Sequence, residues 1–267
     1  MKKKLGFALG AGGSRGVAHI GFLKAMDEEG IKPDFIAGTS MGSIVGACYC
    51  AGYTPDFMID EILKLKMSDI FDLSLNAVKD GALLKAQKMR KKLSSYFTEK
   101  KTFDELDIPF RCVAVNLVNG QMVIFSGKDD VAESIATSST IPGVFKPVLK
   151  AGMVLVDGGI KCRVPIDTVR DMGAEVVIAV DVMSELRTGK ERYHYAGLML
   201  RTFEVMDDEI TKMKIKKQKP NLYLVPELGD MSQFKFKDLQ FAFEQGYKLG
   251  KENAKKIKKL IKEDNKK

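Results

Sequence analysis

Gly38-Thr39-Ser40-Met41-Gly42 decides the fold, because an apolar run enters it at Phe35–Ala37 and another leaves it at Ile44–Ala47. This order predicts a strand, a sharp turn and a helix. The five residues spell G-x-S-x-G, the nucleophile elbow, whose glycines allow a turn tight enough to push the serine hydroxyl clear of the sheet. Two interpretations of Ser40 stay open at this point: a nucleophile, or simply the N-cap of the following helix.

A second glycine-rich stretch, Gly10–Gly16, follows the predicted strand Leu5–Leu9 and precedes a helical pattern that starts at Val17. Successive backbone N–H groups beside a helix N-terminus suit a negatively charged oxygen. The stretch fits neither phosphate motif. Read from Gly10, the dinucleotide pattern G-x-G-x-x-G ends on Arg15, and the P-loop ending G-K-[ST] is absent. An oxyanion hole and a plain tight turn remain as the two interpretations.

Asp157-Gly158-Gly159 forms the third stretch, at the end of a strand predicted over 153–156. Ligands of α/β sheets collect outside the carboxyl ends of the strands, so we expect Asp157 to be able to face Ser40. The alternative is a turn former, because an Asp before two glycines is common in turns. Asp181, after a strand predicted over 175–180, is a rival acid without adjacent glycines.

Only two histidines, His19 and His194, are present to complete a Ser-His-Asp triad. We expect a packing role for His19 and a surface position for His194, which leaves Asp157 as the better base. An Asp with an ordinary pKa of about 3.9 is a weak base at neutral pH. Either desolvation raises the pKa of Asp157, or most of the catalysis comes from the N–H groups of the oxyanion hole. Residues 158–159 are not apolar, which favours the second explanation.

The remaining pattern predicts one α/β domain over residues 1–267, with three layers and a mainly parallel central sheet flanked by helices. A hairpin is predicted from strands over 111–117 and 121–125, joined by a type I′ turn at Asn119-Gly120. Residues 67–80 have little periodicity and suggest a mobile flap over the site. Residues 138–147 suggest a rigid loop. Further helices are predicted over 55–66, 83–97 and 130–137, after Pro165, over 191–217 and from about 237.

The composition indicates the cellular environment of the protein. No C-x-x-C pair occurs among the four cysteines, which favours a reduced, cytoplasmic environment. Lys2–Lys4 before Leu5–Leu9 imitates a signal peptide, but the apolar run is too short. No apolar run approaches the ~20 residues of a membrane span.

The net charge of +8 is concentrated at the C-terminus, where residues 248–267 contain nine lysines and three acidic residues. Such a basic helical tail, from about residue 237, is suited to an anionic surface, such as the inner face of a membrane. The alternative is a solvated helix end. No nucleic-acid-binding motif occurs, so no nucleic-acid partner is expected. The sequence does not indicate an oligomeric state.

Together the three stretches resemble the bacterial patatin-like phospholipases, a family of lipid acyl hydrolases with a Ser-Asp dyad. Ala11–Gly16 resembles the family's G-G-G-x-[RK]-G oxyanion loop, Gly38–Gly42 its elbow and Asp157–Gly159 its D-G-[GA] acid. The likeness extends from about Lys4 to Val180. Ala11 departs from the pattern, because it replaces the first glycine and restricts the orientation of that N–H group.

The resemblance implies that Ser40 attacks an ester carbonyl, that Asp157 accepts its proton and that a glycine loop stabilises the oxyanion. The implied donors are the N–H groups of Gly12, Gly13 and Met41. The implied substrate is a fatty acyl ester such as a phospholipid or lysophospholipid, without a metal or organic cofactor. The residues expected to support the motifs are Arg15, Gly16, Gly38, Gly42, Gly158 and Gly159.

Arg15 has two possible roles, to steady the glycine loop or to meet a lipid phosphate, and the first is favoured. A competing hypothesis for the whole chain is a non-catalytic regulator or adaptor that keeps the patatin fold and binds lipid or protein. Intact Ser40 and Asp157 favour the enzyme, because a purely binding module needs neither.

Overall fold

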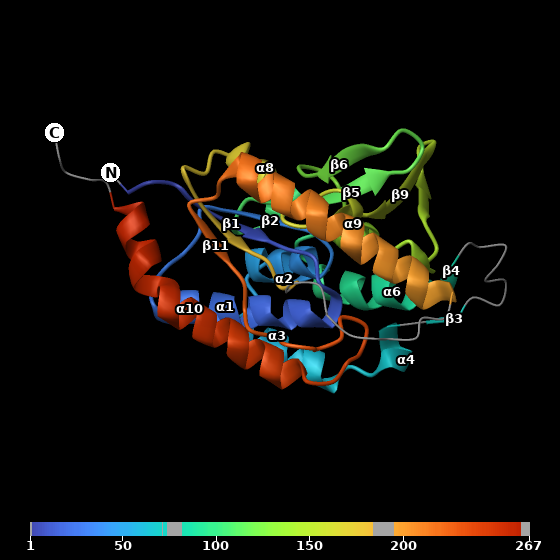
Figure 1. Cartoon of the computed structure of the whole chain (residues 1–267), viewed down its shortest axis with the longest axis horizontal. Coiled ribbons are helices and arrows are strands. Elements are labelled where there is room, and N and C mark those ends of the chain that lie inside the picture. The colour runs from blue at the N-terminus through green and yellow to red at the C-terminus, as the bar shows by residue number, and fades with distance from the viewer. Residues whose placement is uncertain (1, 71, 74–81, 184–194, 263–267) are drawn as a thin grey trace.

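The computed structural model describes residues 2–70, 72–73, 82–183 and 195–262 (Figure 1). Its main sheet has eight strands in the order β11-β10-β1-β2-β5-β9-β8, and β6 also pairs with β5. The neighbours from β11 to β5 are parallel, whereas β6, β8 and β9 join by antiparallel pairing. The strands are β1 (Leu5–Leu9), β2 (Phe35–Gly38), β5 (Phe110–Asn116), β6 (Gln121–Phe125), β8 (Val148–Lys150), β9 (Met153–Asp157), β10 (Val176–Val180) and β11 (Leu222–Leu224).

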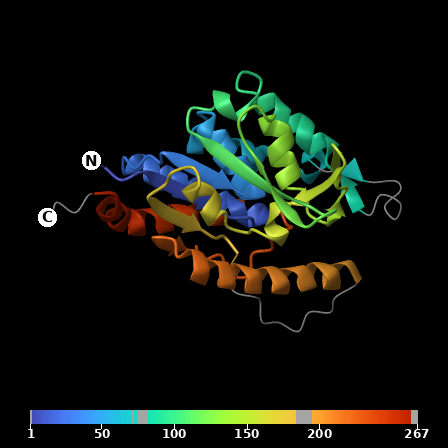
Figure 2. The same cartoon turned by 90° about the horizontal axis from the view of Figure 1, so that it is seen from above.

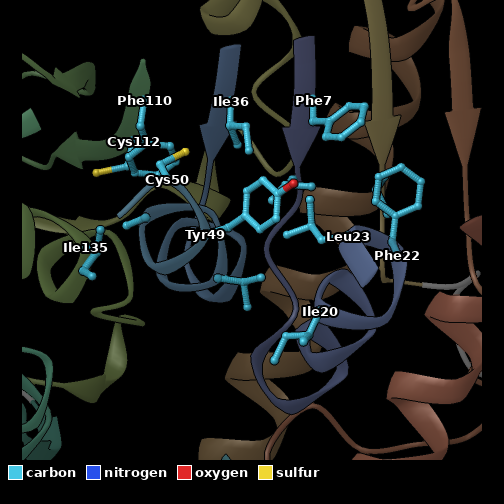
Figure 3. Close-up of a cluster of buried hydrophobic side chains, with 14 of the residues drawn as sticks. Phe7, Ile20, Phe22, Leu23, Ile36, Tyr49, Cys50, Phe110, Cys112 and Ile135 are labelled. Atoms are coloured by element: carbon cyan, nitrogen blue, oxygen red, sulfur yellow. The ribbon is translucent and has the colours of Figure 1, made fainter. Parts of the chain in front are cut away.

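Helices cover both faces of this sheet, which confirms the predicted three-layer α/β fold (Figure 2). Side chains alternate between the faces of a strand, and β1 shows the consequence. Phe7 enters the large core with α1 (Ala18–Glu28) and α2 (Met41–Cys50), where its ring packs edge-on against Phe22 at 5.2 Å between centroids (Figure 3). Ala8 faces the smaller cluster beneath α8 (Ile166–Arg170).

The remaining elements surround this framework. Two helices begin at side-chain caps: Thr54 accepts a hydrogen bond from the N–H of Phe57, and Asp130 from that of Glu133. Besides α1, α2 and α8, the described helices are α3 (Pro55–Lys64), α4 (Met67–Ile70), α6 (Gln87–Tyr96), α7 (Val131–Ser138), α9 (Tyr195–Gln218) and α10 (Leu239–Ile261), with 3-10 turns at Gly13–Val17, Phe103–Glu105 and Gly158–Ile160. A small second sheet contains β3 (Asp72–Leu73), β4 (Ala82–Lys85) and β7 (Gly143–Phe145).

The C-terminal helix α10 packs along α1 rather than standing apart as a tail (Figure 1). Its backbone comes so close that a Cβ atom at Gly246 would lie 1.8 Å from the carbonyl oxygen of Ala18. Ion pairs add to this contact, because Lys258 lies 2.8 Å from Glu29 and Lys251 also pairs with Glu29. The helix therefore buries its apolar face and leaves other lysines exposed.

Strands β2 and β9 end close to each other along one edge of β5, and this arrangement positions the residues that follow each strand. Because β6 occupies the opposite edge of β5 over 112–116, β2 and β9 share the remaining edge. Gly38, the last residue of β2, pairs with Cys112, and Asp157, the last residue of β9, pairs with Ala114. At about 3.3 Å per residue, the two strand ends lie roughly 7 Å apart along β5.

Several predicted boundaries change. The predicted helix over 83–97 begins only at Gln87, because residues 82–85 form β4 and pair with β7. The predicted loop over 138–147 therefore contains a strand. The hairpin is confirmed, but Asn116 pairs with Gln121 across a four-residue loop instead of a type I′ turn. Within the predicted flap, α4 and β3 are formed, and residues 71 and 74–80 lie outside the described residues.

Candidate active site

Ser40 occupies a strained turn between β2 and α2. Its backbone angles, φ 53° and ψ −125°, lie in a region that L-residues rarely adopt and that costs roughly 1–3 kcal/mol. Its N–H donates to the Ser138 hydroxyl at 3.0 Å, and that hydroxyl donates to the carbonyl of Val113 at 2.7 Å. The elbow is thus fastened to β5 by a side chain from α7. This strain is the geometry expected of a nucleophile elbow rather than of an ordinary N-cap.

The elbow glycines permit close backbone contact. A Cβ atom at Gly42 would lie 2.3 Å from the carbonyl oxygen of Leu9, and one at Gly38 would lie 2.5 Å from that of Gly42. Any side chain at these positions would displace the start of α2 from the end of β1. The G-x-S-x-G pattern therefore brings the elbow and the first glycine loop together.

Asp157 accepts a hydrogen bond from the Ser40 side chain, and its Oδ1 accepts another from the N–H of Gly159 at 2.7 Å. Burial raises the pKa of Asp157 to about 7, and the nearby Asp207 carboxylate pushes it in the same direction. The expectation of an undesolvated carboxylate, drawn from residues 158–159, is wrong. The surrounding elements that bury Asp157 are distant in sequence. Gly158 packs against the Val113 carbonyl of β5, which fixes the turn after Asp157.

The rival acid, Asp181, belongs to a separate buried ion-pair network. Arg163 lies 2.9 Å from Asp181 and 2.9 Å from Asp207 of α9. Tyr223 also donates to Asp181, at 2.6 Å. Asp181 is therefore engaged by a guanidinium and a phenol, and it does not contact Ser40 through any interaction of the described residues. The network links α9 to the ends of β10 and β11.

The first glycine loop, Gly10–Gly16, lies beside Ser40. The N–H of Ala11 donates to the Arg163 carbonyl at 2.9 Å, so this group is already engaged and the departure at residue 11 removes no donor. Gly13 has φ 53°, and a Cβ atom there would lie 2.2 Å from the Gln233 carbonyl oxygen. Within the described chain, no protein acceptor is assigned to the N–H groups of Gly12, Gly13 and Met41. All three residues lie at the two hollows that meet at Ser40.

Arg15 is buried and holds the loop from within. Its Nε donates to the carbonyl of Val182 at 2.8 Å and its Nη1 to that of Met231 at 3.2 Å. These contacts support the loop-steadying role over contact with a lipid phosphate. Gly16 faces Met41 so closely that a Cβ atom there would lie 2.4 Å from the Met41 side chain. The two loops are therefore packed against each other at the predicted oxyanion site.

His19 is fully buried, and its Nε2 donates to the Gly10 carbonyl at 2.8 Å. Burial lowers the pKa of His19 to about 4, so the ring is neutral at pH 7. This is the packing role predicted for His19, and among the described residues the ring forms its hydrogen bond with Gly10 rather than with Ser40 or Asp157. His194 lies outside the described residues.

An apolar cavity of about 310 Å³ opens at Ser40. Ser40 and Gly13 are also part of a second hollow of about 120 Å³, which includes Asp157 and runs under α9 past Phe203 and Met206. The serine thus stands where an apolar chamber meets a smaller passage. Sequence reasoning missed three supporting residues, Ser138, Arg163 and Gln233, because each contributes through a contact across the fold rather than through a local motif.

The chain is similar in sequence to a known protein family. The family model of the patatin-like phospholipases matches residues 7–170, which include all three motifs. The chain therefore belongs to the patatin-like phospholipase family, as the resemblance indicated.

Curated relatives share this region. An uncharacterised NTE family protein of Mycobacterium tuberculosis is 32% identical over 181 residues, covering 67% of this chain and 49% of that protein. Lysophospholipase NTE1 of Pyricularia oryzae is 29% identical over 185 residues, covering 68% of this chain and 12% of that protein. The chain thus spans about half or less of the length of these relatives.

The fold is also similar to solved structures. VipD from Legionella pneumophila aligns with 96% of this chain and 67% of its own, at a TM-score of 0.53 and 10% identity. Full-length ExoU of Pseudomonas aeruginosa, in complex with SpcU, aligns with 98% of this chain and 53% of its own, at a TM-score of 0.50 and 12% identity. At these identities the likeness concerns the fold alone.

Proposed function

We propose that the protein is a serine ester hydrolase that releases fatty acids from phospholipids or lysophospholipids through an acyl-enzyme. The observation that carries the proposal is the hydrogen bond from Ser40 to a buried Asp157 at the mouth of an apolar cavity. Membership of the patatin-like phospholipase family supports a lipid substrate. An apolar chamber next to the nucleophile suits an acyl chain. Transfer of the chain from water into the chamber stabilises the complex by about 0.8 kcal/mol per methylene.

Each step uses a group at the site. The Ser40 Oγ attacks the ester carbonyl while its proton passes to Asp157, and the carbonyl oxygen becomes an oxyanion. The N–H groups of Gly12, Gly13 and Met41 stabilise this charge. Collapse of the intermediate expels the alcohol, which takes the proton back from Asp157. Water then attacks the acyl-enzyme, gives its proton to Asp157, and releases the fatty acid as the proton returns to Ser40.

The raised pKa of Asp157 supports this assignment. A general base is most effective when its pKa lies near the working pH, and a value of about 7 meets that condition. The competing adaptor hypothesis gives no reason to hold Ser40 in a strained conformation beside a desolvated carboxylate. Both features lower stability, and structures retain them where they serve a function.

The proposal also covers the domain organisation, the cellular location and the membrane contact of the enzyme. We propose a single patatin-like domain over residues 1–267 that works in the cytoplasm and contacts anionic lipid at the inner membrane face through exposed lysines of α10. Among the described helices, none combines the length and apolarity needed to cross a bilayer. Contact through surface lysines is compatible with that finding, since each lysine near an anionic surface contributes about 1 kcal/mol.

The test is turnover by purified protein on p-nitrophenyl esters, a diacyl phospholipid and a lysophospholipid. The expected result is hydrolysis by the wild type and by Ser95→Ala, an exposed-serine control on α6, but not by Ser40→Ala. Circular dichroism would establish that all three proteins are folded. Hydrolysis by Ser40→Ala at the wild-type rate, or by none of the three folded proteins, would contradict the proposal.

A further inference from the structure

The apolar cavity follows the length of α2 away from the nucleophile. One face of this helix lines it, at helical spacing: Met41, Ile44, Val45 and Cys48. At 1.5 Å per residue, the cavity extends for about 10 Å from Met41 to Cys48. Opposite walls come from α6 and β7, through side chains such as Leu93 and Phe145. The chamber is therefore elongated along a line that starts at Ser40.

Three aromatic rings stand together at the other end of this line, beyond the C-terminus of α2. Tyr53 stacks on Phe57 of α3 with 5.0 Å between ring centroids. Tyr96 of α6 meets Tyr53 edge-on at 5.9 Å and Phe57 at 6.4 Å. The Tyr53 hydroxyl also donates to the Tyr96 carbonyl at 2.6 Å. All three rings line the cavity, and they are hereafter called the aromatic wall.

Charged side chains support the aromatic wall at the same end. The Tyr96 hydroxyl donates to Glu61 at 2.8 Å, and Lys92 lies 3.6 Å from the same carboxylate. The Lys92 ammonium also lies 5.0 Å from the centre of the Tyr96 ring. These contacts bridge α3 and α6. An acyl chain that reached Glu61 and Lys92 would have to displace their water, which opposes further penetration.

We infer that the aromatic wall formed by Tyr53, Phe57 and Tyr96 is an end-stop that limits the acyl chain to medium length; this rests on the proposed function. Two estimates agree on that length. A methylene fills about the volume of one liquid water, about 30 Å³, so 310 Å³ holds about ten carbons. An extended chain advances about 1.3 Å per carbon, given C–C bonds of about 1.5 Å, so about eight carbons span the α2 face.

Chain-length dependence of hydrolysis tests the end-stop. With p-nitrophenyl esters of 4 to 16 carbons below their aggregation limits, kcat/KM of the wild type should rise about fourfold per methylene. The rise should stop near ten carbons. The Phe57 ring has no polar group, so Phe57→Ala breaks no hydrogen bond of this side chain. In this variant kcat/KM should continue to rise for about two more carbons. The ratio of kcat/KM for twelve carbons to that for eight should then increase on the order of tenfold over the wild type.

Matched variants separate the aromatic wall from general loosening of α3. Leu63→Ala removes an exposed apolar side chain of the same helix that does not line the cavity, and it should keep the wild-type break. Tyr96→Phe keeps the ring and loses only the contacts of its hydroxyl with Glu61 and Lys92, so the chain length at which its rise stops should also stay near ten carbons. A wild-type profile without a break, or Phe57→Ala matching Leu63→Ala, would overturn the end-stop.

Binding provides a readout that is independent of turnover. Fatty acids of 6 to 16 carbons can be titrated against Ser40→Ala and Ser40→Ala/Phe57→Ala by thermal shift. The stabilisation should stop growing near ten carbons in the first protein and near twelve in the second. If hydrolysis fails but this shift is observed, the proposed function is wrong and the end-stop stands. If hydrolysis occurs without any shift of the break, only the end-stop is wrong.

Discussion

The Ser40 hydroxyl and the Asp157 carboxylate share a hydrogen bond because β2 and β9 end two residues apart on the same edge of β5. One strand arrives parallel to β5 and the other antiparallel, so their last residues face each other. The glycines after each strand then turn the chain away. This meeting of strand ends supplies the proposed dyad without any contribution from a histidine.

The raised pKa of Asp157 predicts a stability cost that depends on pH. The folded-state value, about 7, lies above the ordinary value of 3.8, so the folded state binds the proton more tightly. The free energy of unfolding should therefore fall as pH rises from about 4 to 7, by up to about 4 kcal/mol. Asp157→Asn avoids this cost. Because pH 5 already lies above the ordinary pKa, urea unfolding should show that Asp157→Asn exceeds the stability of the wild type by more at pH 8 than at pH 5.

The control for this measurement is Asp60→Asn, an exposed position on α3. It should follow the wild type at both pH values. If Asp157→Asn gained no stability at pH 8 relative to Asp60→Asn, Asp157 would not be held in a desolvated environment.

The same carboxyl predicts the pH dependence of catalysis. Only ionised Asp157 accepts the proton of Ser40, so kcat/KM should fall with unit slope below a pKa of about 7. Asp157→Asn should lose about 10²–10⁴-fold in rate, and its residual activity should lack this limb. Stopped assays from pH 4.5 to 9 measure both. A limb near pH 4 in the wild type would show that oxyanion donors, rather than desolvation of the base, dominate.

His19 should matter for stability rather than for catalysis. Its Nε2 donates to the Gly10 carbonyl in a fully buried position, so His19→Ala loses packing and a hydrogen bond. We expect a loss of about 2 kcal/mol in the free energy of unfolding, with kcat/KM per folded molecule within a few-fold of wild type. Active-site titration would give the folded fraction. A folded but inactive His19→Ala would replace the dyad with a triad.

Exposed lysines of α10 should bind anionic vesicles. Charge reversal at Lys255, Lys256 and Lys259 should remove about 1 kcal/mol of binding per lysine that lies near the surface. Sedimentation with anionic and neutral vesicles at low and high salt measures this, because the attraction is screened by salt. Reversal at Lys216 and Lys217 of α9 is the matched control and should have less effect. Equal binding of the wild type to both vesicle types would remove the membrane role.

The sequence predicted those parts of the fold that local patterns encode. The apolar runs at 5–9 and 35–38, each followed by a glycine loop and a helix, are formed as expected. The hairpin strands β5 and β6 are also formed as expected, since the turn signal Asn119-Gly120 lies between them. The likeness to the patatin-like family, found through the three motifs, agrees with the family match.

Features that depend on distant contacts could not be predicted. Burial of Asp157 comes from elements such as β5 that are far away in the sequence, whereas the two residues that follow Asp157 are glycines. The sequence near β9 contains no signal for its antiparallel pairing with β5. Residues 83–85 continue a helical pattern, which their pairing with β7 overrides. The Ser138 hydroxyl accepts a hydrogen bond from the N–H of Ser40 in the elbow, and no sequence motif identifies this contact.

Acylation of Ser40 can be detected by rapid-quench mass spectrometry of the enzyme mixed with p-nitrophenyl octanoate. We expect a burst of p-nitrophenol and an octanoyl mass on the peptide that contains Ser40. Asp157→Asn should form this adduct far more slowly, and Ser40→Ala should form none. An octanoyl group on another residue, or full turnover by Ser40→Ala, would show that Ser40 is not the nucleophile.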